Sequence, residues 1–275
     1  MVLSVSLCRA DSAHPLTHED LNKTVNDFQL LIDLHRHAER QGPGGEAETI
    51  RALELAGLDR SRSLKIADIG CGTGASTIVL AKALNAHITA VDFLPELLDE
   101  LQSRANDQGV AARITTLSGS MDDLSFVPGE FDVIWSEGAV YNMGFEAGVS
   151  AWRRFLKPGG KLIVSEITWL SARRPPELSS HWEAEYPEID VASARIGILE
   201  RQGYSPEAYF VLPAHCWLDN YYRPMQRRFD AFLERHGASV EAMAIVEAEQ
   251  HEISLYEKYR DYYSYGVYVA KRPIV

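Results

Sequence analysis

Apolar and polar positions follow two different periodicities along this chain. Near the start, apolar residues spaced mainly three and four positions apart predict an amphipathic helix over Glu19–Glu39. Further along, short apolar runs such as His87–Val91 are each followed by a segment with helical spacing. Strands that alternate with helices predict an α/β protein built on a largely parallel sheet. The apolar positions of the first helix are Leu21, Val25, Phe28, Leu31, Ile32 and Leu34.

The same two periodicities predict the remaining strands and helices. The predicted strands are 66–69, His87–Val91, Arg113–Leu117, Phe131–Trp135, Lys161–Glu166, Ala208–Leu212 and Tyr265–Ala270. The predicted helices are Ala47–Ala56, Ala75–Leu84, one that begins at Pro95, then 191–202, Arg223–Arg235 and Val240–Asp261.

A glycine-rich turn follows the first predicted strand. Gly70, Gly72 and Gly74 alternate there, and Asp68 stands two positions ahead of them. Glycines let the backbone approach a ligand closely, and the next helix directs its free N–H groups at the same place. The glycines alone also satisfy a loose dinucleotide pattern. Asp68 favours a ligand with an ammonium group, because a carboxylate repels a pyrophosphate.

A second acid ends the next strand. Asp92 stands where a carboxylate can accept hydrogen bonds from both hydroxyls of a ribose, and Phe93 after it can cover one face of an adenine. Asp92 is also compatible with a helix cap, since Pro95 opens the next helix. Either NAD or S-adenosylmethionine fits this pair, so the pattern predicts an adenosine without choosing between them.

Five motifs in order then resemble the class I S-adenosylmethionine-dependent methyltransferases, of the small-molecule, methyltransferase type 11 kind. The likeness covers about residues 64–166. It implies a Rossmann-like seven-stranded sheet of order 3-2-1-4-5-7-6, with strand 7 antiparallel, helices on both faces and helical insertions forming a lid. The motifs are Asp68-x-Gly70-x-Gly72-x-Gly74, the strand end at Asp92, the loop 119–126, Phe131-Asp-Val-Ile134 and Leu156-Lys-Pro-Gly-Gly-Lys-Leu162.

The resemblance also implies a cofactor site for S-adenosylmethionine. It places the methionine end at the glycine turn, the ribose at Asp92 and the adenine beside the loop 119–126. In relatives with a similar Arg-Gln-Gly-Pro-Gly stretch the N-terminal segment folds over the cofactor, although that stretch also suits a simple helix break. The predicted cofactor-binding residues are Arg40, Gln41, Gly42, Asp68, Gly70, Cys71, Gly72, Gly74, Asp92, Phe93, Ser120, Met121, Asp122, Ser136 and Glu137.

The segment that leaves the fourth strand carries the substrate-side candidates. We expect Glu137, Tyr141 and His181 to be catalytic, with Glu166 and His215 as weaker candidates. Glu137 could orient an amine, act as a base or face the sulfonium of the cofactor. Positioning alone can suffice, because the donor is already activated. Trp169, Trp182 and Trp217 suit either a wall of the substrate cavity or the packing of helices on the sheet.

The composition of the chain limits the classes of molecule that it is expected to bind. The 275 residues carry a net charge of -12, which disfavours a nucleic-acid surface. Three scattered cysteines and the absence of a long apolar run predict a cytoplasmic chain with no disulfide framework and no membrane span. No metal is expected, since the histidines of His35-Arg-His37 point in different directions on a helix. The partner is then a small-molecule acceptor, and a homodimer stays open.

The predicted organisation is one methyltransferase domain over 1–275. It comprises a helical cap at 1–60, a cofactor core at 61–166 and substrate-side insertions with the last two strands at 167–275. Three alternatives remain: a methyltransferase that acts on a protein, a nicotinamide-dependent oxidoreductase and a non-catalytic cofactor-binding module. The oxidoreductase lacks support, because no Tyr-x-x-x-Lys motif is apparent.

Overall fold

The structure is a computed structural model that describes residues 18–274, with side chains from 27 to 274. Cys8 and the rest of the segment before residue 18 lie outside the described residues. The same holds for the side chains of Leu21 and Val25, two of the apolar positions used to predict the first helix.

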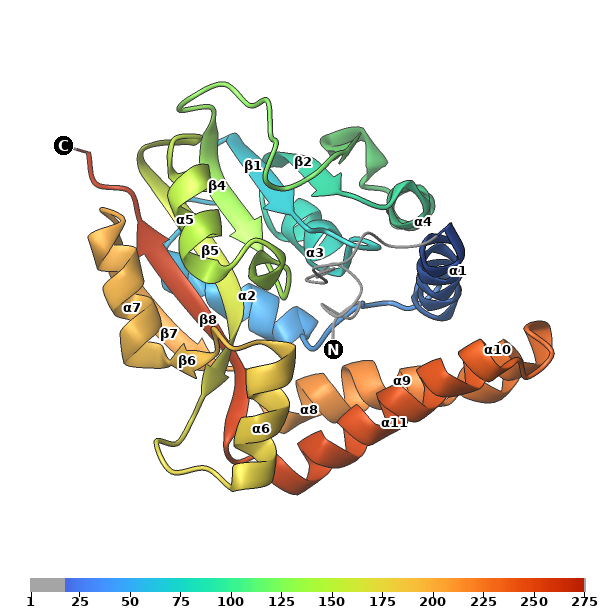
Figure 1. The fold of residues 1–275 in the computed structure, drawn as a ribbon. Helices are drawn as coiled ribbons and strands as arrows, with labels where there is room; N and C mark the ends of the chain where they lie inside the picture. The colour runs from blue at the N-terminus through green and yellow to red at the C-terminus, as the bar shows by residue number, and fades with distance from the viewer. Residues whose placement is uncertain (1–17, 275) are drawn as a thin grey trace.

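One mixed sheet forms the centre of the molecule (Figure 1). Its strand order is β3-β2-β1-β4-β5-β8-β7, and the two-residue strand β6 pairs separately with the end of β5. The prediction did not include β6, so its sixth and seventh strands correspond to β7 and β8. The predicted order 3-2-1-4-5-7-6 is therefore confirmed. The strands are β1 Leu64–Ile69, β2 Ala86–Asp92, β3 Ile114–Ser118, β4 Phe131–Ser136, β5 Leu156–Trp169, β6 Asp190–Val191, β7 Ser205–Val211 and β8 Tyr263–Lys271.

The pairing is parallel from β3 to β5 and antiparallel at β8, as the prediction required. The buried strand β1 shows why the chain folds this way. Ile66 belongs to the apolar cluster on one face of the sheet and Ala67 to the cluster on the other, and both are fully buried. A strand covered on both faces needs apolar residues at successive positions, which is typical of parallel sheets. The polar Asp68 within it is therefore exceptional.

Helices cover both faces of the sheet (Figure 1). Most predicted bounds agree to within a few residues, but the predicted helix Arg223–Arg235 is broken at 227–228 into two helices. Neither arginine there is a helix breaker, so local propensity does not predict the turn. The helices are α1 His18–His35, α2 Glu46–Ala56, α3 Ala75–Ala83, α4 Pro95–Asp107, α5 Phe145–Arg153, α6 Pro176–Glu185, α7 Ala192–Arg201, α8 Ala214–Trp217, α9 Arg223–Gln226, α10 Phe229–Arg235 and α11 Val240–Tyr259.

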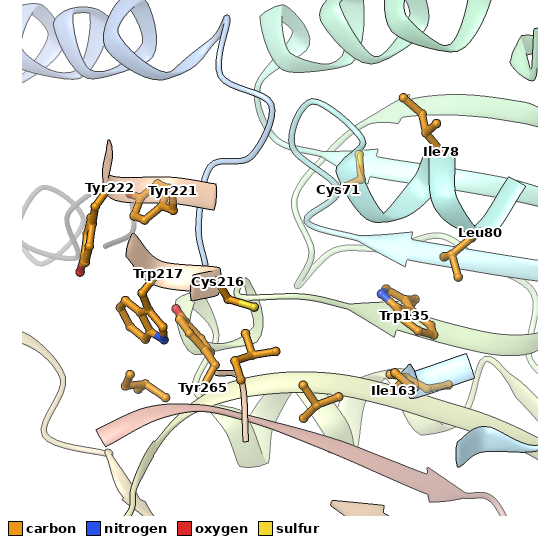
Figure 2. Close-up of a cluster of buried hydrophobic side chains, with 14 of the residues drawn as sticks. Cys71, Ile78, Leu80, Trp135, Ile163, Cys216, Trp217, Tyr221, Tyr222 and Tyr265 are labelled. Carbon is orange, nitrogen blue, oxygen red and sulfur yellow. The ribbon is translucent and has the colours of Figure 1, made fainter. Parts of the chain in front are cut away.

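Aromatic rings of the C-terminal half pack with one another and not around an open cavity. Trp217 stacks on Tyr256 with centroids 4.4 Å apart and on Tyr265 at 5.4 Å; Figure 2 shows Trp217 beside Tyr265. Trp169 and Trp182 meet edge to face at 6.5 Å. All of these rings are buried, so the suggestion that these tryptophans wall a cavity is wrong, and they belong to the core.

The first helix joins this C-terminal unit to the cofactor core. Asp33 of α1 accepts hydrogen bonds from Arg235 at 2.8 Å and pairs with His236 at 3.0 Å. On its other side α1 packs on α4, where Ile32 meets Leu94 and Leu97. Figure 1 shows α1 between α4 and the pair α10 and α11. Within the described part of the chain, no helix has the length and apolar character needed to cross a bilayer.

Candidate active site

A cavity of about 500 Å³ opens where the central strands β1, β2 and β4 end. Ligands of open α/β sheets bind at this carboxyl edge, and small-molecule sites commonly measure about 300 to 1,000 Å³. Helix α1 contributes Phe28 and Leu31 to its wall, and the segment after α6 contributes Tyr186 and Glu188. The predicted site residues that line it are Arg40, Gln41, Gly42, Gly70, Cys71, Gly72, Asp92, Phe93, Ser120, Met121, Asp122, Glu137 and Tyr141.

The glycine turn forms the floor of this cavity. At Gly72 the φ angle is +55°, and a Cβ there would stand 2.3 Å from Oε1 of Gln41. Gly74 has φ +80° and faces Leu101, whose Cδ1 would be 2.0 Å from a Cβ. Any side chain at either position would meet both backbone strain and a collision. Gly74 does not line the cavity; it brings α3 close to α4.

Asp68 lies under the turn and not in the cavity wall. It is fully buried, and its Oδ2 accepts hydrogen bonds from Thr77 at 2.6 Å and Ser76 at 3.0 Å. Oδ1 has no partner among the described residues. Burial raises the pKa of Asp68 to about 7, with Glu137 adding repulsion and the two hydroxyls opposing the shift. A cation bound at the turn would stabilise its charged form.

Asp92 is fixed at the cavity wall by backbone groups. Its Oδ2 accepts a hydrogen bond from the N–H of Gly72 at 2.8 Å, and its Oδ1 accepts one from Leu94 at 3.0 Å. Burial raises its pKa, and these backbone donors act against the shift. Each carboxylate oxygen keeps a second lone pair, so Asp92 can still accept hydrogen bonds from a ligand. Phe93 beside it is 66% exposed and presents an apolar ring to the cavity mouth.

The loop after β3 closes another side of the cavity. Ser120 donates a hydrogen bond to Oδ1 of Asp122, and the carbonyl of Met121 accepts one from the indole of Trp152 at 3.0 Å. These bonds fix the loop against α5. The cavity thus has an acid and an apolar side chain on the wall where an aromatic ring of a ligand could lie.

Glu137 is held by three donors from three elements. Its Oε2 pairs with Arg40 at 3.2 Å, while Oε1 accepts hydrogen bonds from Thr49 at 2.9 Å and Trp135 at 3.0 Å. Arg40 and Glu137 are 10% and 18% exposed. A pair this enclosed holds a guanidinium and a carboxylate at fixed positions in the cavity wall. This arrangement suits positioning of a ligand more than proton removal, because three of the acceptor positions of Glu137 are occupied.

Gln41 fastens the segment between α1 and α2 onto the glycine turn. Its Oε1 accepts a hydrogen bond from the N–H of Thr73 at 2.9 Å, and its amide donates to the carbonyls of His35 and Ala38, both at 3.3 Å. Oγ1 of Thr73 lies 3.1 Å from the same amide and itself donates a hydrogen bond to the carbonyl of Ala38 at 2.9 Å. Gln41 and Thr73 together therefore join the turn to the cap.

Several predicted residues lie away from the cavity. Ser136 is buried without a hydrogen-bond partner for its Oγ among the described residues. His181 faces His251, with ring centroids 6.3 Å apart, and burial lowers its pKa. Glu166 is fully buried in β5, and His215 lies beside Glu48. The structure does not bring His181 to the other catalytic candidates.

Sequence reasoning missed part of the cavity wall. Tyr186 meets Tyr141 edge to face at 6.2 Å, and Glu188 lies over Gly144, where a Cβ would be 2.9 Å from its Oε2. Asn142 and these residues line the same cavity as Asp92. Nothing local marks Tyr186 or Glu188, since they come from an insertion outside the five motifs.

Comparison with known proteins agrees with this geometry. Residues 66–160 match the model of a methyltransferase-domain family. The biotin biosynthesis bifunctional protein BioCD of Bordetella avium is 32% identical over 183 residues, which are 62% of this chain and 37% of that protein. The demethylmenaquinone methyltransferase of Lactiplantibacillus plantarum is 28% identical over 179 residues, 64% of this chain and 69% of its own.

A solved structure shares the fold. The S-adenosylmethionine-dependent methyltransferase from Geobacter sulfurreducens, in complex with S-adenosyl-L-homocysteine, superposes with a TM-score of 0.76 at 18% identity and covers 89% of this chain and 97% of its own. The sequence matches to the first curated relatives span only 19% to 37% of those proteins.

The fold and the glycine-turn cavity define a class I methyltransferase architecture. Over residues 66–160 the chain matches a methyltransferase-domain family, and its fold is that of the methyltransferase structure described above. The match and the fold agree with the family that the sequence resembles. The residues present fit S-adenosylmethionine, the cofactor that the resemblance implies: Gly70, Gly72 and Asp92 line the cavity, and Asp68 beneath the turn has an oxygen without a partner among the described residues.

Proposed function

We propose that this protein transfers a methyl group from S-adenosylmethionine to a small-molecule acceptor, with S-adenosylhomocysteine as the second product. The observation that carries the proposal is the set of residues around one cavity. The glycine turn and Asp92 at the end of β2 line it, and so do Tyr141, Tyr186 and Glu188 from the segments after β4 and α6. Since β1 separates β2 from β4 in the sheet, a donor beside Asp92 and an acceptor beside Tyr141 can meet in this one cavity.

The end near Asp92 is the cofactor site in this proposal. Asp92 accepts hydrogen bonds from the ribose, Phe93 covers the adenine, and the loop 120–122 borders it. The segment at Gly42 closes over the methionine end. Arg40 binds the methionine carboxylate, because a guanidinium has five donors and the structure shows one of its nitrogens bonded to Glu137.

The bound cofactor supplies an activated methyl group. The residues of the chain then have to align the acceptor and keep water out. Glu137 holds Arg40 in place and puts negative charge near the reacting centre. Tyr141 lies on the segment that follows Glu137 and orients the acceptor. We assign these two residues to positioning and electrostatics, and His181 has no part in the reaction.

A small acceptor fits the enclosure better than a protein does. Phe28 and Leu31 of α1 and the pair Tyr186 and Glu188 close the cavity from two sides. The demethylmenaquinone methyltransferase described above is named for a small-molecule acceptor. We further propose that the whole chain acts as one methyltransferase unit in the cytoplasm, without nucleic acid, and that its surface permits a homodimer.

The first test is calorimetric titration of the purified chain with S-adenosylmethionine, S-adenosylhomocysteine and NAD in parallel. We expect the first two to bind and NAD not to bind. Binding of NAD alone would overturn the cofactor assignment and with it the proposal.

The second test identifies the size of the acceptor. S-Adenosylmethionine with a labelled methyl group is incubated with the protein and a lysate, which is then separated into small molecules and macromolecules. We expect protein-dependent label in the small-molecule fraction, lost with D92A. Label recovered mainly in protein would replace the small acceptor by a protein substrate.

A further inference from the structure

Glu48, His215 and Cys216 form a cluster of donor atoms behind the cofactor cavity. Glu48 comes from α2 and the other two from α8, so the cluster joins two elements that are far apart in the sequence. One ligand atom of each residue lies within 4.8 Å of the others. Cys216 is fully buried, while the side chain of His215 is 48% exposed.

The three side chains converge on one point. Nε2 of His215 lies 3.3 Å from Oε1 of Glu48 and 3.7 Å from Sγ of Cys216. In a proton relay, the acid would hold one ring nitrogen while the other faced the thiol. Here the same nitrogen faces both groups. This geometry is that of shared ligands and not of a Cys-His-Glu nucleophile.

The spacing also fits a tetrahedral ion. Zinc binds nitrogen and oxygen at about 2.0 to 2.2 Å and sulfur at about 2.3 Å. With tetrahedral angles these lengths separate a nitrogen and an oxygen by about 3.4 Å, and a nitrogen and a sulfur by about 3.6 Å. The observed 3.3 Å and 3.7 Å agree closely with these values.

The carboxylate of Glu48 is enclosed on both sides. Its Oε1 faces His215, while Oε2 is buried against Gly45 and has no hydrogen-bond partner among the described residues. A Cβ at Gly45 would be only 2.1 Å from Oε2, so glycine makes room for the carboxylate. A cation bound at Oε1 would compensate the negative charge of a carboxylate that is so poorly hydrogen-bonded.

We propose that Glu48, His215 and Cys216 bind one divalent transition-metal ion, for which Zn²⁺ is the best match. A thiolate, an imidazole and a carboxylate suit zinc better than the hard cations, which prefer oxygen alone. This site differs from the expectation of no metal, which rested on the diverging histidines of His35-Arg-His37.

The ion would fasten α8 to α2 beside the cofactor-binding segment. Asn220 already donates a hydrogen bond to the carbonyl of Gly44 at 2.7 Å, and the N–H of Gly44 reaches the carbonyl of Cys216 at 3.4 Å. Gly42 of that segment lines the cavity. The site is thus structural, and it does not depend on the proposed methyl transfer.

The test uses the full chain without a histidine tag, stripped of metal by a chelator. Titration with Zn²⁺ should show one equivalent bound, and Co²⁺ should give a thiolate-to-cobalt absorption band. We expect H215A to weaken Zn²⁺ binding by at least about 100-fold, since even partners that only orient a ligand are worth 10- to 100-fold. C216S should abolish the cobalt band.

The matched control is C71S, which removes the other described buried cysteine. It should keep both the band and the affinity. Zn²⁺ should also raise the unfolding temperature of the wild type and of C71S, but not that of H215A, whose half-exposed side chain is tolerant of replacement. Absence of the cobalt band in the wild type, or unchanged Zn²⁺ affinity in H215A, would overturn the proposal.

Discussion

Single carboxylates in this protein are positioned by backbone N–H groups and neighbouring side chains. Asp92 shows this most directly. The backbone N–H of Gly72, in the glycine turn, donates a hydrogen bond to one carboxylate oxygen, and the N–H of Leu94 donates to the other. The carboxylate is therefore oriented before any ligand arrives. Preorganised acceptors bind a ligand without losing further side-chain freedom.

We expect D92A to weaken binding of S-adenosylmethionine by roughly 10- to 150-fold. A hydrogen bond to a charged group is worth about 1.5 to 3 kcal/mol, and Asp92 is proposed to accept from the ribose. Calorimetric titration measures the change. The control is D99A, because Asp99 is an exposed acid on the following helix α4 and does not line the cavity. Equal affinity of D92A and wild type would disprove the ribose assignment.

Residues of the cofactor half could be predicted because their roles depend on local sequence. A glycine before a helix and an acid at the end of a strand both lie at the carboxyl edge of a parallel sheet, which is where ligands bind. Tyr186 and Glu188 could not be found this way, since their place at the cavity depends on how an insertion folds back. The engagement of Glu137 by Thr49 and Arg40 was equally hidden, because it needs three distant segments to meet.

At the scale of elements, the cap depends on how the segment between α1 and α2 is attached. Gln41 makes hydrogen bonds to both sides of this junction, to Thr73 of the glycine turn and to the carbonyls of His35 and Ala38. Two further side chains support this junction: Thr73 donates a hydrogen bond to the carbonyl of Ala38 at 2.9 Å, and Arg104 donates to the carbonyls of Glu39 at 2.9 Å and Thr73 at 2.8 Å. The cap and the cofactor turn should therefore loosen together.

We predict that Q41A raises the dissociation constant for S-adenosylmethionine by about tenfold and speeds amide hydrogen exchange over 36–45. Loss of several hydrogen bonds of about 1 kcal/mol each supports this size, since part of the loss is recovered by water. Hydrogen exchange and calorimetry measure the two effects. Q29A is the control, because Gln29 is exposed on α1. A variant with faster exchange but wild-type affinity would separate the cap from cofactor binding.

Helices and strands could be predicted where the hydrophobic periodicity is strong. Their bounds were less predictable where tertiary packing determines where an element ends. The helix predicted over Arg223–Arg235 is divided at 227–228, although no glycine or proline marks the break. Arg228 there donates to the carbonyl of Leu34, which ties the junction to α1. A tertiary contact of this kind leaves no trace in local propensity.

At the scale of the whole molecule, the topology followed from the order of the strands and the family resemblance, and the sheet confirmed it. The burial of acidic side chains inside the sheet could not be predicted in this way. Glu166 lies in β5 with no exposure, and its Oε1 accepts a hydrogen bond from Ile167 at 2.8 Å while Oε2 has no partner among the described residues. Sequence alone places an acid on a strand but cannot say that the acid is fully covered.

Burial raises the pKa of Glu166 from its ordinary 4.5 to about 8, although the charge of Arg195 opposes the shift. Between these two values the native protein holds a proton that the unfolded chain has lost. The free energy of unfolding therefore falls as pH rises through this window, by up to about 1.4 kcal/mol per pH unit from this one group. Asp68, with a pKa raised to about 7, adds a loss of the same sign.

We predict that E166Q flattens this decline, because the neutral amide has no proton to lose. Urea unfolding at pH 5, 6, 7 and 8 should show the variant close to wild type at the lowest pH and more stable at the highest. E257Q serves as the control, since Glu257 is exposed on α11 and its replacement should leave the slope unchanged. Asp68 remains in all three proteins, so a residual slope is expected. Parallel curves for wild type and E166Q would mean that Glu166 is charged in the native protein throughout, and that Arg195 outweighs burial.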